Sequence, residues 1–110
     1  MLLIGGLLLS RLHRRAEALD EACLRASGHP DDYEIREELL SALEWDELLH
    51  PKHAKPVIRD LFEQVHHHSA DLAKRIRSGS GAHLIADGIH DLRSRLAAFQ
   101  QALQARHSET

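Results

Sequence analysis

The amino-acid sequence predicts an all-α protein, folded as an antiparallel up-down-up-down four-helix bundle. Aromatic residues make up only 4% of the 110 residues, so the core has to be built from Leu, Ile and Ala, a composition that favours helices over sheets. Apolar residues recur every three to four positions, which is the period of an amphipathic helix. Glycine and proline interrupt this pattern and leave four helical segments, whose short connections favour antiparallel neighbours.

The first segment is predicted to be helical from about Leu2 to Ala26. Its core-facing stripe consists of Leu8, Leu12, Ala16, Leu19, Cys23 and Ala26. Ser27-Gly28-His29-Pro30 ends it, with glycine past the last turn and proline beyond. Cys23, the only cysteine, is interpreted as a small core residue.

The second segment is predicted to be helical over residues 31–50. Asp31 and Glu34 resemble a capping box, which would satisfy the free amides of the first turn. Its apolar stripe consists of Ile35, Leu39, Ala42, Leu43 and Leu49. Asp46 also falls on this stripe, so we expect a bend or restart near Trp45, and Pro51 ends the helix.

The third and fourth helices are expected over about 54–77 and 82–106, joined by a tight turn at residues 78–81. The third stripe consists of Ile58, Leu61, Phe62, Val65, Leu72 and Ile76. The fourth consists of Ile85, Ile89, Leu92, Leu96, Phe99 and Leu103. Residues 1–107 are therefore predicted to form one domain, and residues 108–110 a frayed polar tail.

The charge and composition of the chain limit which partners and which cellular compartment are expected. The formal net charge of −3 gives no general attraction to nucleic acid. An unpaired cysteine fits a reducing compartment, so we expect a cytoplasmic protein. Arginine far outnumbers lysine, which is typical of bacteria with GC-rich genomes. Protonating all ten histidines would add ten charges to −3 and give +7, so the surface charge should change sign in mild acid.

The first nine residues, MLLIGGLLL, are apolar on every side of a helix. This run is less than half of the roughly 20 residues that span a bilayer, and it lacks the preceding positive charge of a signal peptide. We therefore expect no transmembrane segment; a peripheral membrane anchor is the alternative. One stripe cannot bury all of these side chains, so the sequence predicts a homo-oligomer. The predicted interface residues are Leu2, Leu3, Ile4, Leu7, Leu8, Leu9 and, at its rim, Phe62.

Histidines and carboxylates at helical spacing suggest a metal site. The candidate ligands are Glu63, His66, His67, Asp87 and His90. Two pairs among them, Glu63-x-x-His66 and Asp87-x-x-His90, lie on the third and fourth helices. Residues at the same height on these two antiparallel helices have numbers that add to about 160, so the two pairs are about six residues apart along the bundle. The side chains of Glu63, His67, Asp87 and His90 also point away from the apolar stripes, so a solvated polar face is favoured and no cofactor is expected.

The segment His90-Asp91-Leu92-Arg93-Ser94-Arg95-Leu96 resembles the phospho-acceptor box of sensor histidine kinases, with Arg95 where that family has proline. The resemblance covers seven residues. It implies that an exposed His90 accepts a phosphoryl group from an ATP-binding domain and that Asp91 polarises it. No ATP-binding motif accompanies the box in this chain.

The predicted helix over residues 31–50 is strongly acidic and offers a surface for a basic protein partner. The chain contains no recognisable catalytic signature. The sequence therefore favours a non-enzymatic, self-associating interaction module of the adaptor, inhibitor or immunity type. The alternative is a helical bundle that carries out histidine phosphotransfer or binds metal through histidine and carboxylate groups.

Overall fold

Four helices make up the regular structure, and the predicted all-α class is confirmed. The computed structural model describes residues 2–29, 32–46 and 49–108, and their side chains except those of residues 2–6 and 106–108. The helices are α1 (Leu2–Gly28), α2 (Tyr33–Ala42), α3 (Pro56–Arg77) and α4 (Ala82–Ser108). No residue in these ranges lies in a β-strand, and no helix among them is both long and apolar enough to cross a bilayer.

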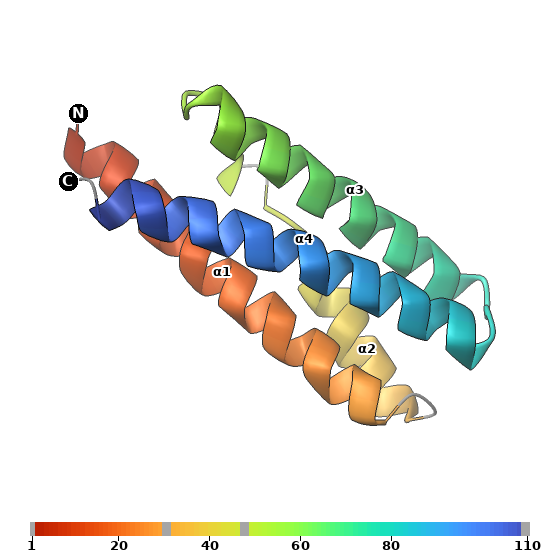
Figure 1. Ribbon diagram of the computed structural model, residues 1–110. Helices are drawn as coiled ribbons and strands as arrows, with labels where there is room; N and C mark the ends of the chain where they lie inside the picture. The colour runs from red at the N-terminus through yellow and green to blue at the C-terminus, as the bar shows by residue number, and fades with distance from the viewer. Residues whose placement is uncertain (1, 30–31, 47–48, 109–110) are drawn as a thin grey trace.

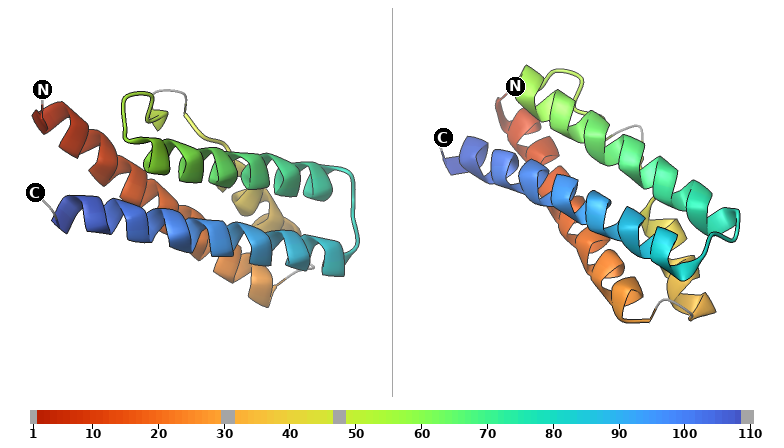
Figure 2. Two further views of the ribbon diagram at one scale, coloured as in Figure 1. Left: turned by 45° about the horizontal axis from the view of Figure 1, so that its top comes forward. Right: turned by 45° about the vertical axis from the view of Figure 1, so that its right-hand side comes forward.

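The two ends of the chain lie at the same end of an elongated bundle, because α4 runs back along α1 (Figures 1 and 2). α4 also packs closely on α3, whereas α2 packs on α1 and touches α3. With 10 residues, α2 is about 15 Å long, against about 40 Å for the 27 residues of α1. The up-down-up-down order therefore stays a prediction for the bundle as a whole.

The predicted second helix is too long, because α2 ends at Ala42 rather than near residue 50. Its N-cap is Asp32, whose side chain accepts a hydrogen bond from the Ile35 amide at 3.2 Å, whereas Asp31 lies outside the described residues. Leu43 closes the last turn with αR geometry. The described residues 44–46 and 49–55 form irregular structure with short turns, and Pro56 begins α3.

Arg15 of α1 determines where α2 ends. Its Nη2 atom donates hydrogen bonds of 2.6 Å to the backbone carbonyls of Ala42 and Glu44, and its guanidinium lies 5.2 Å from the centre of the Trp45 ring. The Trp45 indole in turn donates a hydrogen bond of 3.1 Å to the hydroxyl of Ser69 on α3. This arrangement, called here the Arg15 tie, joins α1, the end of α2 and α3.

The turn between α3 and α4 fixes how these helices align. Gly79 has a positive φ of 74°, and the amides of Gly79 and Ser80 bond back to the carbonyls of Ile76 and Arg75, which forms a Schellman motif. Arg95 donates a hydrogen bond of 3.1 Å to Gln64, a pair whose numbers add to about 160 as predicted. A methyl group at Gly88 would lie 3.0 Å from Leu72, so glycine permits the close approach of the two helices.

The predicted apolar stripes form one core. Its members from α1 are Leu12, Ala16, Leu19, Cys23 and Ala26, and those from α4 are Ile85, Ile89, Leu92, Leu96, Phe99 and Leu103. Phe62 belongs to this core with 1% of its surface exposed, and its ring contacts the rings of Trp45, His50 and Phe99. The expectation that Phe62 lies at an accessible rim is therefore wrong for the folded chain, because the segment after α2 covers it.

We predict that Arg15→Gln destabilises the protein by about 1.5–3 kcal/mol, because two carbonyls lose a charged donor in a half-buried position. The matched control is Arg25→Gln on the same helix, which removes an exposed ion pair of 2.7 Å with Glu38 and should cost less than about 1 kcal/mol. Urea unfolding followed by circular dichroism measures both values. Equal losses would contradict the role assigned to the Arg15 tie.

Candidate functional site

The outer side of α1 carries the predicted interface residues that remain accessible. Leu7 is 55% exposed, whereas Leu8 and Leu9 are partly buried against the core. The side chains of Leu2, Leu3 and Ile4 lie outside the described part, although their backbone belongs to α1. Leu7 is thus the exposed apolar residue around which an interface can be built.

A groove of about 610 Å³ runs between α1 and α4, and its lining on α1 begins at Leu9, two residues after Leu7. Its lining residues are Leu9, Ser10, His13, Arg14, Glu17, Leu103 and Gln104. His13 Nε2 lies 2.6 Å from a Glu17 carboxylate oxygen, whereas His13 Nδ1 is buried and has no hydrogen-bond partner among the described residues. The groove therefore combines an apolar floor with a charged rim.

Two chain segments near this end of the bundle contain no charged side chain. Residues 2–10 of α1 and residues 96–105 of α4 contain no Asp, Glu, Lys or Arg, although the chain carries 14 basic and 17 acidic residues. Figure 1 shows that these two segments lie at the same end, next to the chain termini. Because protein–protein interfaces are depleted of charge at their centre, this end has the composition of an interface.

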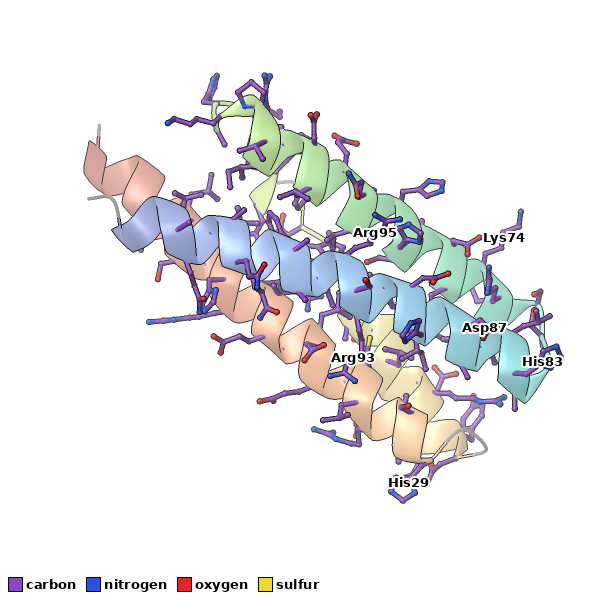
Figure 3. All side chains as sticks on the ribbon, viewed as in Figure 1. His29, Lys74, His83, Asp87, Arg93 and Arg95 are labelled. Atoms are coloured by element: carbon purple, nitrogen blue, oxygen red, sulfur yellow. The ribbon has the colours of Figure 1, made fainter. Side chains whose placement is uncertain are left out.

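The structure does not bring the candidate metal ligands together. Glu63 lies 3.3 Å from His50, His66 stacks near Phe62, and the His67 ring contacts that of His68. Asp87 and His90 are exposed on α4, and Figure 3 shows Asp87 on a different helix face from Arg93. Within the described ranges, no three His, Cys, Asp or Glu side chains are placed to hold one ion.

His90 lines a second, smaller cavity of about 330 Å³ between α4 and the end of α1. Ser27, Arg93 and Ser94 contribute to the same cavity, whereas Asp91 is exposed beside it. Arg93 points towards α1, where its Nε donates a hydrogen bond of 2.9 Å to Asp20, and this bond raises the pKa of Arg93 (Figure 3). The predicted phospho-acceptor is thus accessible and has a permanent positive charge nearby.

The acidic segment is partly neutralised by arginines of other helices. Arg25 of α1 pairs with Glu38 at 2.7 Å, and Arg77 of α3 approaches Glu44 at 3.9 Å. Within the predicted range 31–50, Asp31 and Glu47 lie outside the described residues. A basic protein partner for this surface stays a prediction.

The sequence did not indicate the roles of Arg15 and Asp20. Arg15 donates a hydrogen bond to the Ala42 carbonyl at the end of α2, 27 positions away in the chain. Asp20 joins α1 to α4 through Arg93. Both contacts link residues far apart in the chain, and neither has a local sequence signal that could have revealed it.

Comparison with protein-family models, with curated proteins and with solved structures finds no significant match to this chain.

Cys23 provides a test of how tightly the centre of α1 is packed. Burial raises the pKa of its thiol from 9.0 to about 12, and the charge of Asp20 adds to this shift while that of Arg93 opposes it. We predict that a disulfide reagent at pH 8 modifies Cys23 only as fast as the chain unfolds. Modification within the mixing time would contradict this burial.

The same shift predicts a dependence of stability on pH. Above pH 9.0 the unfolded thiol loses its proton while the folded thiol retains it up to about pH 12, so the stability falls over this range. Urea unfolding of the wild type and of Cys23→Ala at several pH values isolates the contribution of the thiol. An identical alkaline slope in both proteins would exclude it.

Proposed function

We propose that this protein is a non-enzymatic helical interaction module that self-associates through the outer side of α1 and the adjoining groove. The observation that carries the proposal is the exposed Leu7 at an end of the bundle whose helices carry no charge in residues 2–10 and 96–105. A cytoplasmic location is part of the proposal and is supported by the single unpaired cysteine.

The energetics favour covering this surface. Burying a leucine side chain contributes about 1.5–3 kcal/mol. In a symmetric dimer each interface leucine is present in both copies, so it contributes this amount in each of them. The groove beside Leu7 offers apolar walls at Leu9 and Leu103, into which a partner side chain can pack. Residues 2–10 and 96–105 contain no ionic group that would have to be desolvated, so the cost of desolvation is confined to the charged residues farther along α1, such as Arg14 and Glu17.

We predict that the wild-type protein sediments as a species of at least twice 12.4 kDa at micromolar concentration and that Leu7→Glu shifts it towards the monomer. The substitution places a carboxylate where the partner has to exclude water, which disfavours the complex. Sedimentation equilibrium or light scattering measures the change, and circular dichroism verifies that the helices are retained.

The matched control is Val57→Glu, because Val57 is 57% exposed on α3 and lies outside the proposed surface. This variant should associate like the wild type. A wild-type chain that remains monomeric would refute self-association, and Leu7 would then serve another protein or a membrane surface.

Phosphotransfer on His90 is a second candidate function, favoured by the cavity that His90 shares with Arg93, Ser27 and Ser94. An imidazole nitrogen of His90 would attack the phosphorus of a phosphoryl donor, and the bond between phosphorus and the donor's leaving group would break. Arg93 would stabilise the negative charge of the phosphoryl oxygens. Arg93 retains its terminal nitrogens for this purpose, because only its Nε binds Asp20 among the described residues.

We predict, for this candidate, that phosphoramidate adds one phosphoryl group to the protein with release of ammonia, and that His90→Ala prevents it. Intact-mass spectrometry measures the addition. His83→Ala is the matched control, because His83 is also an exposed histidine on α4. Equal labelling of both variants, or no labelling of the wild type, would eliminate phosphotransfer.

A further inference from the structure

We propose that the self-association partner is a second copy packed antiparallel on α1, with Arg14 of each copy facing Glu17 of the other. This inference rests on the proposed function and adds the orientation and register of the complex. It follows from the pattern of side chains on the side of α1 that faces neither α2 nor α4.

The exposed side of α1 carries a regular stripe. It consists of Leu7, Ser10, Arg14, Glu17, Glu21 and Leu24. These residues are spaced by three, four, three, four and three positions, which is the heptad spacing of a helix that packs along another helix. All but the half-buried Ser10 are exposed, so the stripe is available to a partner.

The stripe is complementary to itself when a second copy runs in the opposite direction. Residues 7 and 24, 10 and 21, and 14 and 17 form three pairs whose numbers all add to 31. In an antiparallel pair of helices, residues with a constant sum lie at the same level. Leu7 therefore meets Leu24 of the other copy, Ser10 meets Glu21, and Arg14 meets Glu17.

This register also uses the whole helix. The centre of the three pairs lies between Arg15 and Ala16, within one residue of the midpoint of Leu2–Gly28. A two-fold axis at this point makes the two helices overlap along their full length of about 40 Å. A register shifted by one heptad would leave a leucine exposed at each end.

The charges distinguish the antiparallel arrangement from the parallel one. In a parallel pair, Arg14 would face Arg14 and Glu17 would face Glu17, which is repulsive. In the antiparallel pair, each Arg14 faces a carboxylate, and the symmetry repeats this contact. Arg14 forms no ion pair within the described part of the chain, whereas Glu17 contacts His13 of its own helix at 2.6 Å through one carboxylate oxygen, which leaves the other oxygen for the partner's arginine.

Leu24 is placed to enter the groove between α1 and α4. It is 55% exposed and lies 40° around α1 from Asp20, which contacts α4. Leu24 lies at the edge of the stripe nearest α4, and the two-fold rotation places α4 of both copies on the same side of the contact. Leu24 of one copy therefore lies over the groove of the other copy, at the level of Leu7. There it is within one turn of Leu9 and opposite Leu103. The exposed Leu24 of one copy can thus pack into the groove of a second copy of this chain.

Charge reversal tests the register. Arg14→Glu alone places Glu opposite Glu at two equivalent positions, and Glu17→Arg alone places Arg opposite Arg. Each variant should therefore self-associate about tenfold or more weakly than the wild type. When the two variants are mixed in equal amounts, every contact is again between opposite charges, so heterodimers should form with near wild-type affinity. Native mass spectrometry after isotopic labelling of one variant identifies them.

The controls separate this inference from the proposed function. Arg59→Glu, exposed on α3, changes the net charge by the same amount as Arg14→Glu and should leave self-association unchanged. If both single variants associate like the wild type, the register is wrong while self-association stands. If the mixed heterodimer is clearly tighter than the wild-type dimer, the helices are parallel and the inference fails, because in a parallel pair the wild type places like charges at both levels and the mixture places opposite charges there. A monomeric wild type refutes the proposed function itself.

Discussion

The hydrogen bonds from Arg15 to the carbonyls of Ala42 and Glu44 hold together a bundle whose second helix is too short. α2 covers only part of the gap between α1 and α3, so the segment that follows it has to complete the core. The Arg15 tie ends α2, positions the Trp45 ring and connects it to Ser69 on α3. Phe62 then packs under Trp45 and His50 rather than facing solvent. A single guanidinium therefore binds the chain at the point where helix gives way to irregular structure.

This constraint also divides the surface of α1. The side that carries Leu12, Leu19 and Cys23 is buried, and the flanks contact α2 through Arg15 and α4 through Asp20. Only the remaining side is accessible, and it carries the stripe from Leu7 to Leu24. The fold thus leaves exposed the one side of α1 on which leucines and opposite charges are arranged symmetrically about its midpoint.

Much of this fold could be predicted from local patterns. The periodicity of apolar residues predicted the spans of α1, α3 and α4 to within two residues, and the turn at Gly79 predicted the levels at which Gln64 and Arg95 meet. Asp46 on the apolar stripe predicted an interruption near Trp45, but not that α2 ends at Ala42, because Arg15 binds the Ala42 carbonyl from 27 positions away in the chain. The prediction of Phe62 at an accessible rim was wrong because the segment that covers Phe62 follows this end of α2. For the site, the apolar N-terminal run predicted Leu7 as an interface residue, which stays a prediction although Leu7 is exposed. The exposure of Leu24 was not predicted, because it depends on which side of α1 the other helices cover.

The composition of the α1 stripe suits a contact that is selective rather than strong. Its leucines lie at the two ends, where burial contributes most of the attraction, while Arg14 and Glu17 occupy the centre. Charged residues in the middle of a helix–helix contact cost desolvation, so they add little affinity, but a mismatched register leaves them facing like charges or apolar groups. An entirely apolar stripe would bind more tightly and would accept parallel and shifted partners. The central charges therefore restrict α1 to one orientation, which is the property that an interaction module requires.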